Sequence, residues 1–227
     1  MICSVMPMAN AEAKDPRLRD CAYSSFTQKL LAQDLHPGQF VSQRELVELT
    51  GMPLGAIREM IPRLEADGLI EAVPKRGLQV LTIDLDLVRN AFQLRRIIEG
   101  EAISQFCASA TDADIARLEA EHREVRDAAA AGVTPDILTR AQLIDWAFHD
   151  LIIDRLDNQI ISDIHRINAI KIRLIRNSDT RMLPDLVVSV LDEHLAVIAA
   201  LRDRDAKRAI IALHDHIESA RRRALGL

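Results

Sequence analysis

The stretch from Val41 to Val80 constrains the fold of this chain more than any other part of the sequence. It holds two short segments in which apolar residues recur with helical spacing, and Gly51 separates them. Ser42 is a residue type that caps helix N-termini, and Pro53 is tolerated in a first helical turn, where its missing N–H would lack a partner anyway. We therefore predict one helix over residues 43–50 and a second that begins near Pro53.

Two short β-prone runs, residues 69–73 and 78–82, follow this second helix, which Gly68 ends. They are joined by the basic tetrapeptide Pro74-Lys75-Arg76-Gly77, so we predict a hairpin with a cationic tip. The order helix, tight turn, helix and hairpin is that of a winged helix-turn-helix. In that fold the second helix enters the major groove of DNA and the hairpin, or wing, lies along the backbone. The order therefore favours DNA binding.

Short motifs occur in this region in the order His36-Pro37-Gly38, Arg44-Glu45-Leu46, Ile57-Arg58-Glu59, Leu64-Glu65-Ala66-Asp67-Gly68-Leu69-Ile70 and Arg76-Gly77. With these motifs, residues 23–82 resemble the DNA-binding domain of GntR-family transcriptional regulators. Members of that family usually carry Ser-Arg-Thr just before the helix that bears the arginine, and here those positions read Pro53-Leu54-Gly55. The resemblance therefore implies that base readout depends on Arg58 and Arg44, and that the operator differs from those of better-known relatives.

The charge of the chain does not by itself indicate a nucleic-acid binder. The net charge is −5, and residues 1–80 carry 9 Lys and Arg against 10 Asp and Glu, a net of −1. Contacts to DNA must therefore come from a few placed cations and the wing turn rather than from a field over the whole domain. The candidate DNA-binding residues are Arg44, Arg58, Lys75, Arg76 and Gly77. Because two half-sites double such a small set, we expect a homodimer on an inverted repeat.

The sequence shows no targeting or membrane signal. Residues 1–16 lack the basic start and the apolar run of a signal peptide, and we expect them to form a flexible leader. No segment reaches the ~18 apolar residues of a membrane span. Cys3, Cys21 and Cys107 are odd in number and widely spaced, which argues against a disulfide framework. We therefore expect a soluble protein of the reducing cytoplasm.

The sequence predicts two domains of different class. Residues 17–82 are assigned to the winged helix-turn-helix, whose first helix we predict over residues 23–36. Residues 83–227 show helical periodicity and no strand signal, and the chain is 48% hydrophobic with only 3% aromatic residues, which suits aliphatic helix packing. The predicted helices cover residues 84–109, 112–131, 136–156, 159–177, 184–203 and 205–224. The fold class is therefore mainly α, with a C-terminal all-α bundle.

Four residues of the predicted bundle have the chemistry of metal ligands. Asp145 and His149 are four residues apart and so lie on one side of a helix, with Cβ atoms roughly 5 to 6 Å apart. His194 lies on an apolar stripe, where an imidazole has no water to satisfy it, and His216 lies near the edge of another stripe. If they converge, they would bind a borderline divalent ion such as Zn²⁺ or Ni²⁺. A buried histidine is, however, more often a hydrogen-bonded core residue than a ligand.

The same residues carry a second resemblance. Asp145-Trp146-Ala147-Phe148-His149, Glu193-His194 and His216 look like the Asp, His, His, His tetrad of the FCD ligand-binding domain, which occurs in the FadR-type branch of the GntR family. The segments around Arg95 and Asn158 fit the same domain, and we take these two as candidate effector-binding residues. The resemblance implies a metabolite-responsive transcription factor, which we expect to be a repressor. Because an octahedral ion held by these four ligands keeps two positions for ligand oxygens, we expect the effector to be a small organic acid that chelates the metal through two oxygens. Arg95 would pair with another part of that acid.

Two other functions are compatible with the sequence. A metal-dependent hydrolytic enzyme could use Glu193 beside the metal to activate water, although four protein ligands leave few free positions and an enzyme gives no reason for the wing. A helical protein-interaction module with a degenerate winged helix would explain the missing Ser-Arg-Thr. In that case Arg58 and Glu59 form only a surface ion pair, and Lys75-Arg76 is only a soluble turn. A gel-shift assay on upstream DNA and a turnover assay with Zn²⁺ separate these functions.

Overall fold

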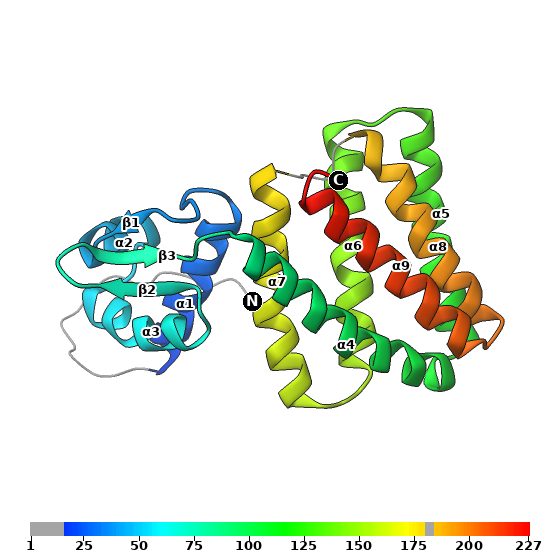
Figure 1. Ribbon diagram of the computed structural model, residues 1–227, viewed down its shortest axis with the longest axis horizontal. Coiled ribbons are helices and arrows are strands. Elements are labelled where there is room, and N and C mark those ends of the chain that lie inside the picture. Colours follow the sequence, from blue (N-terminus) through cyan, green and yellow to red (C-terminus); the bar gives the residue numbers. More distant parts are fainter. Residues whose placement is uncertain (1–15, 180–183) are drawn as a thin grey trace. The chain divides into compact units, whose positions relative to one another are not determined.

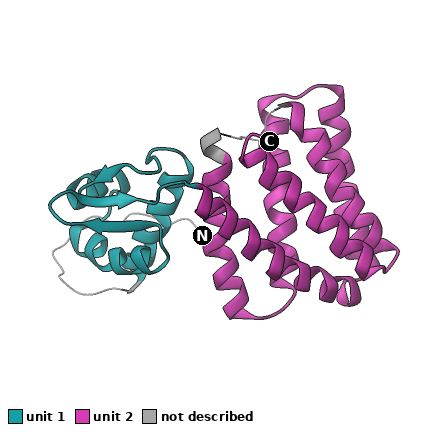
Figure 2. Cartoon of the chain, in the orientation of Figure 1, with its two compact units in different colours: residues 1–84 teal, residues 85–227 magenta. Residues whose placement is uncertain are grey.

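The computed structural model describes residues 16–179 and 184–227 and divides the chain into two compact units (Figure 2). The division falls between Asp84 and Leu85, whereas the sequence analysis placed the domain boundary between residues 82 and 83. The expected leader, residues 1–16, lies outside the described residues except for Pro16, which opens the first helix. The mainly α fold class, with a winged helix-turn-helix and a helical bundle, is confirmed (Figure 1).

The described part of the N-terminal unit, residues 16–84, has three helices and a small antiparallel sheet. The elements are α1 (Pro16–Leu31), β1 (Phe40–Val41), α2 (Gln43–Thr50), α3 (Leu54–Ala66), β2 (Ile70–Val73) and β3 (Gly77–Val80). The strands lie in the order β1-β3-β2, with Phe40 opposite Gln79 and Val73 opposite Gly77. The predicted hairpin is therefore confirmed, and its strands are shorter than expected.

Two details of this unit correct the sequence analysis. The first helix covers residues 16–31 rather than 23–36, because Gln33 takes a left-handed φ of 66° and the amide of Asp34 donates back to the carbonyl of Lys29, which closes the helix early. Leu35 lies in the turn after the helix, and its side chain is buried there. Its apolar side chain therefore fits the helical spacing of the sequence although the residue is outside the helix. Strand β1 was not expected at all, because two residues form a strand only through their pairing with β3.

Helix α2 begins and ends where the sequence predicts. The Oγ of Ser42 accepts a hydrogen bond from the amide of Glu45 at 3.2 Å, and the Glu45 carboxylate accepts one from the amide of Ser42 at 2.7 Å. This capping box satisfies two amides that the first turn leaves without a helical partner. At the other end Gly51 has a φ of 69°, a left-handed conformation that suits glycine.

Helix α3 packs on α1 through the predicted apolar stripe. Ile57, Ile61 and Leu64 are all buried in the core of the unit. Arg63 of α3 also contacts α1. Its guanidinium lies over the Tyr23 ring at 4.2 Å and pairs with Asp20 at 3.1 Å. Arg63 is therefore held against α1, and the opposite face of α3, with Leu54 and Arg58, is exposed.

Among the residues that the structure describes, the C-terminal unit consists of helices joined by short loops and has no strand. Its elements are α4 (Leu85–Ser109), α5 (Asp112–Ala131), α6 (Pro135–Asp154), α7 (Gln159–Asp179), the 3₁₀ turn η1 (Pro184–Leu186), α8 (Val187–Arg202) and α9 (Ala206–Ala224). These confirm the predicted helices with small shifts at their ends. In residues 16–179 and 184–227, no helix is both long and apolar enough to cross a membrane.

The helices of this unit form a closed arrangement around one interior (Figure 1). Helix α4 packs on α9, α9 on α8, α8 on α5, α5 on α6, and α6 on α4, while α7 covers α4 and α6. The crossing of α4 and α9 is close, because a Cβ on Gly100 would lie 2.7 Å from the His214 ring. Helices α6, α8 and α9 therefore all face a common interior, and this interior holds the polar cluster described below.

The capping box of α2 gives a first prediction. Ser42→Ala removes the acceptor for the Glu45 amide, and we expect it to lower the free energy of unfolding by about 1 kcal/mol. Thermal or urea denaturation of the purified protein measures this change. Ser24→Ala is the matched control, because Ser24 is exposed within α1, where alanine is at least as favourable as serine. An equal effect of the two substitutions would contradict the capping role.

Candidate metal centre and DNA-binding surface

The structure brings the four predicted ligands together. Asp145 and His149 project from α6, His194 from α8 and His216 from α9. One potential ligand atom from each of them lies within 4.8 Å of the other three. All four side chains are buried, and the least buried, His149, is only 4% exposed. We call these four residues the Asp-His cluster.

Each histidine of the Asp-His cluster is held at its Nδ1 by a residue outside the cluster. For His149 this partner is the carboxylate of Glu99 on α4, at 2.8 Å. For His216 it is the carboxylate of Glu193 on α8, also at 2.8 Å. The Nε2 atoms are left to face one another, and those of His194 and His216 are 3.3 Å apart. Outer partners of this kind set the tautomer and the ring orientation of histidines that bind metals.

The third outer partner is another histidine. The Nδ1 of His122 on α5 lies 2.7 Å from the carbonyl oxygen of Leu118, which can only accept, so this nitrogen carries the proton. Burial lowers the pKa of His122, so the ring is neutral and its Nε2 must be an acceptor. That Nε2 lies 3.2 Å from the Nδ1 of His194, which therefore donates and leaves the Nε2 of His194 with a free lone pair.

The protonation states of the cluster suit metal binding. Burial lowers the pKa of His149 to about 4 and also lowers the pKa values of His194 and His216, so all three imidazoles are neutral near pH 7. Burial would raise the pKa of Asp145, but the Arg176 guanidinium, 2.6 Å from its Oδ2, holds that pKa well below the usual range. The cluster thus offers one carboxylate and three neutral imidazoles, a donor set typical of divalent transition metals.

Two atoms of the cluster have no hydrogen-bond partner among the described residues. They are the Oδ1 of Asp145 and the Nε2 of His149, and both are buried. A buried polar atom without a partner costs roughly 1 to 3 kcal/mol, and such atoms are rare in native proteins. Both are the atoms that would coordinate an ion. The residues present therefore fit a divalent metal ion, and the cluster is consistent with a metal site.

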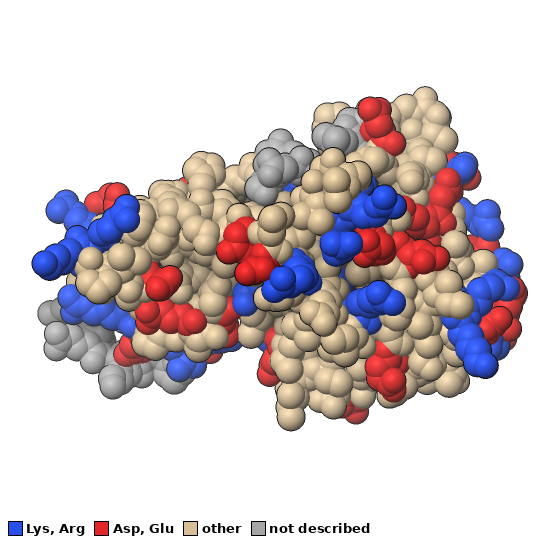
Figure 3. Space-filling view, in the orientation of Figure 1, with Lys and Arg blue, Asp and Glu red and all other residues tan. Residues whose placement is uncertain are grey.

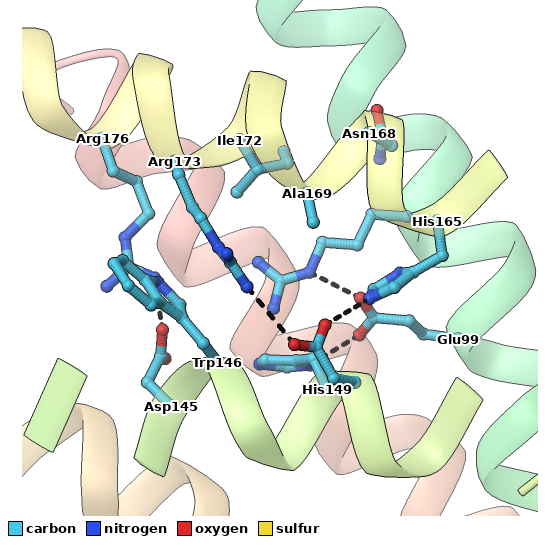
Figure 4. Close-up of a pocket in the computed structure, with 12 residues that line it drawn as sticks. Glu99, Asp145, Trp146, His149, His165, Asn168, Ala169, Ile172, Arg173 and Arg176 are labelled. Carbon is cyan, nitrogen blue, oxygen red and sulfur yellow. Dashed lines mark hydrogen bonds and ion pairs between the residues drawn. The ribbon is translucent and has the colours of Figure 1, made fainter. Parts of the chain in front are cut away.

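A cavity of about 30 Å³ adjoins the cluster between α4, α6 and α7 (Figure 4). Three arginines line it, and each is paired with a carboxylate: Arg95 with Glu99 at 2.8 Å, Arg173 with Asp150 at 3.3 Å, and Arg176 with Asp145 at 2.6 Å. The other lining residues are Trp146, His149, His165, Asn168, Ala169 and Ile172. The lining thus holds three guanidinium groups and the three carboxylates that pair with them, beside the potential metal ligands.

The two expected effector-binding residues have different positions. Arg95 is 5% exposed and lines the cavity, while its neighbour Arg96 is exposed to solvent. Asn158 does not line the cavity: its side chain is exposed and accepts hydrogen bonds from the amides of Ile160 and Ile161 at the start of α7. Asn158 therefore caps a helix, and the structure gives no support for an effector contact there.

Several residues of this site were missed by the sequence analysis. Glu99 and His122 hold cluster histidines, and Arg173 and Arg176 line the cavity from α7. One signal was present, since the polar residues His165, Asn168 and Arg176 share one face of α7 by their spacing, with the apolar Ile172 among them. His122 gave no such signal, because its role depends on α5 packing against α8.

The candidate DNA-binding residues lie at the surface of the N-terminal unit. Arg44 has a side chain that is 89% exposed, and Arg58 is exposed with its Nε 3.2 Å from the Gln43 side chain. Lys75 and Arg76 lie in the turn of the wing, where the Arg76 guanidinium covers the Phe40 ring at 3.8 Å. Lys and Arg side chains gather at the end of this unit where the hairpin turns (Figure 3). This cationic end suits a phosphate backbone.

Gly77 has a role within the fold. Its φ is 99°, which side chains rarely adopt, and a Cβ at this position would lie 3.2 Å from the carbonyl oxygen of Val41. The close approach of β3 to β1 therefore requires glycine here. The expectation that Gly77 itself contacts DNA is a separate one, which we keep as a proposal.

Comparison with known proteins decides the family. The gntR family of bacterial regulatory proteins matches residues 18–80, and the FCD domain matches residues 90–219. This chain belongs to the GntR family. It is a DNA-binding transcriptional regulator with an FCD domain, and the enzyme alternative is excluded because the family consists of regulators rather than enzymes.

Two relatives from Escherichia coli (strain K12) illustrate the similarity. The chain is 26% identical over 183 residues to the HTH-type transcriptional repressor RspR, an alignment that covers 80% of this chain and 78% of RspR. It is 24% identical over 194 residues to a protein named "Probable HTH-type transcriptional regulator LgoR". That alignment covers 83% of this chain but only 62% of LgoR, so the chain spans less than two thirds of the length of this relative.

Solved structures of low sequence identity share the fold. A GntR transcriptional regulator from Rhodococcus sp. RHA1 superposes with a TM-score of 0.71 at 18% identity, covering 93% of this chain and 99% of that one. E. coli McbR/YncC gives a TM-score of 0.69 at 18% identity, covering 89% and 94%. The metal-free FCD domain of TM0439 gives a TM-score of 0.53 at 18% identity, covering 64% of this chain and 96% of that domain.

The buried pair at the cavity gives a second prediction. Arg95→Met leaves the buried Glu99 carboxylate without its guanidinium, and we expect a loss of about 3 kcal/mol in the free energy of unfolding. Arg96→Met is the matched control on the same helix, because Arg96 is exposed, and its effect should stay within about 0.5 kcal/mol. Urea denaturation of both variants measures the difference. Equal stabilities would show that Arg95 does not compensate Glu99.

Proposed function

We propose that this GntR-family regulator is a homodimeric repressor whose affinity for an inverted-repeat operator is controlled by a small carboxylate. The carboxylate would bind in the FCD domain at a divalent metal, Zn²⁺ or Ni²⁺, held by Asp145, His149, His194 and His216. The observation that carries this proposal is the pair of buried, unpartnered ligand atoms beside an arginine-lined cavity. The name of the relative RspR, a transcriptional repressor, supports the sign of regulation.

The effector class follows from the charges that line the cavity. A bound metal ion would supply open coordination positions for carboxylate oxygens. Arg95 and Arg173 offer guanidinium groups that pair with carboxylates in a bidentate way, and the Nε of Arg173 is buried without a partner among the described residues. The cavity of about 30 Å³ has room for roughly one or two water molecules. The acid must therefore be small, and it enters by displacing an arginine from its present carboxylate.

This displacement offers a route from the cavity to the DNA-binding unit. Arg173 and Arg176 join α7 to Asp150 and Asp145 of α6, so a new anion changes the contacts between these helices. Arg95 and Glu99 lie on α4, which begins at Leu85, shortly after β3 ends at Val80. A shift of α4 would therefore move residues 81–84, the chain segment that connects the wing to α4. Coupling of this kind requires that the acid binds one arrangement of α4 better than the other.

The homodimer is proposed from the size of the recognition surface and from exposed apolar side chains. One short helix and a wing read few base pairs, so specificity requires two copies. Ile97 on α4 and Ile211 on α9 are 63% and 60% exposed, and they lie on neighbouring helices of the C-terminal unit. We propose that the self-association surface lies on the first helices of that unit, with α4 at its centre, and that the neighbouring last helix, α9, extends it. Sedimentation at micromolar concentration tests this part of the proposal.

Our third prediction concerns the DNA-contacting residues. Arg58→Ala should weaken operator binding by a factor of about 5 to 150, since one arginine contact to guanine or phosphate is worth about 1 to 3 kcal/mol. Arg76→Ala should reduce the slope of log affinity against log salt by about 1, because it removes a phosphate contact. Fluorescence anisotropy with an operator duplex at several salt concentrations measures both effects.

Arg63→Ala is the matched control for Arg58. Both arginines lie on α3, but Arg63 is held against α1 by Asp20 and Tyr23. Its removal should leave DNA affinity unchanged. Unaltered affinity and salt slope in the Arg58 and Arg76 variants would contradict the proposed surface and favour a winged helix that does not contact DNA.

The metal and the effector give a fourth prediction. Elemental analysis of the purified protein should find about one divalent ion per chain, and His194→Ala should lose it. His122→Phe keeps the buried ring but removes the acceptor for the Nδ1 of His194, and should weaken metal affinity by about 10- to 100-fold. His214→Ala is the control, since His214 lies outside the Asp-His cluster.

Calorimetric titration with a panel of hydroxy and keto acids then tests the effector. We expect binding to the metal-loaded wild type and none to His194→Ala. Protein that takes up no stoichiometric metal, even after Zn²⁺ or Ni²⁺ is added, would contradict the mechanism. Metal uptake without acid binding would leave the metal site intact and reject the effector class.

A further inference from the structure

The first turn of α3 exposes an unusual combination of side chains. Leu54 is 40% exposed, and Gly55 is exposed with no atom within 4 Å of the place where its Cβ would be. Arg58 follows one turn later and is exposed as well. Residues four apart lie on one face of a helix, so Leu54 and Arg58 share a face, and the bare backbone at Gly55 adjoins that face. Ala56 and Ile57 of the same turn are buried against the core.

Exposure of a leucine does not by itself indicate a binding role, since single apolar side chains are common on protein surfaces. The position of Leu54 in the fold is what indicates a role in DNA contact. It is the first residue of the second helix of a helix-turn-helix, and the N-terminal residues of that helix contact base edges in the major groove. Arg58 on the same face adds a cation that suits DNA.

We propose that Leu54 reads a thymine, by apolar contact with its C5 methyl group, next to the base pair that Arg58 contacts. In the major groove thymine is the only base that presents a methyl group, and apolar side chains select it by contact. Leucine cannot pair with the amino and carbonyl edges of the other bases, and covering those edges would leave polar groups without partners. The missing side chain at Gly55 lets this turn approach the bases closely. The inference rests on the proposed role of α3 in DNA contact.

The test begins with the binding site of the full-length protein. Selection from random double-stranded DNA should enrich half-sites in which a thymine stands next to the base pair that Arg58 contacts. That thymine is then replaced by deoxyuridine, which lacks only the methyl group. Because a methyl-sized apolar group is worth about 0.8 kcal/mol when buried, affinity should fall roughly fourfold.

Variants then assign the effect to Leu54. Leu54→Ala should bind thymine and deoxyuridine duplexes equally well, whereas Leu54→Met, which stays long and apolar, should keep the preference. Leu18→Ala is the matched control, since Leu18 on α1 is also 40% exposed, and it should keep the full preference.

Two results would overturn the proposal. One is a wild-type protein that binds deoxyuridine and thymine duplexes equally, and the other is a Leu54→Ala variant that still prefers thymine. Either result would mean that Leu54 does not read thymine, and that it contacts another protein or makes no contact at all. Arg58→Ala separates this failure from a failure of the proposed DNA surface, because it should lower the affinity for both duplexes and keep their ratio.

Discussion

The C-terminal unit depends on one buried carboxylate. Glu99 is completely buried, and burial alone would raise its pKa, but Arg95 and His149 hold that pKa well below its usual range, so the group is ionised. It accepts hydrogen bonds from Arg95 one turn earlier on α4 and from His149 on α6, each at 2.8 Å. An ionised group in an apolar interior is tolerated only when such partners are in place. The contact between Glu99 and His149 therefore joins α4 to α6 and also orients a histidine of the Asp-His cluster.

The sequence predicted most of the fold, because most of its elements are defined locally. Helix α2 has its cap, its period and its terminal glycine within ten residues, and its predicted bounds are those of the structure. The errors occur where distant residues decide. Strand β1 exists only through pairing with β3, and the end of α1 depends on a left-handed residue that no short pattern marks. Leu35 was included in the predicted first helix because it is apolar and helically spaced. In the structure it is buried, but it belongs to the turn after α1.

The candidate site was predicted in its centre and missed at its edges. Asp145 and His149 share a helix face by spacing alone, and His194 and His216 were added because imidazoles on apolar stripes need partners. The residues around them could not be found in this way. His122 matters because α5 and α8 pack together, and Arg176 matters because α7 crosses α6. Asn158, which fits the family by sequence, caps helix α7 through its side chain, and the structure gives no sign of a second role for it.

The close contact between Gly77 and the carbonyl of Val41 has a consequence for how such a wing can diverge. Lys75 and Arg76 have exposed side chains, so mutation can change their chemistry more readily than at Gly77, although Lys75 holds a φ of 65° and the Arg76 guanidinium covers the Phe40 ring. Gly77 cannot follow, since any Cβ there would push against the backbone of β1 and force an unfavourable φ. Side chains at the tip of the wing can therefore change more readily than residue 77, whose φ and contact with β1 require glycine. Invariance at position 77 would then record a constraint of backbone geometry rather than any shared operator.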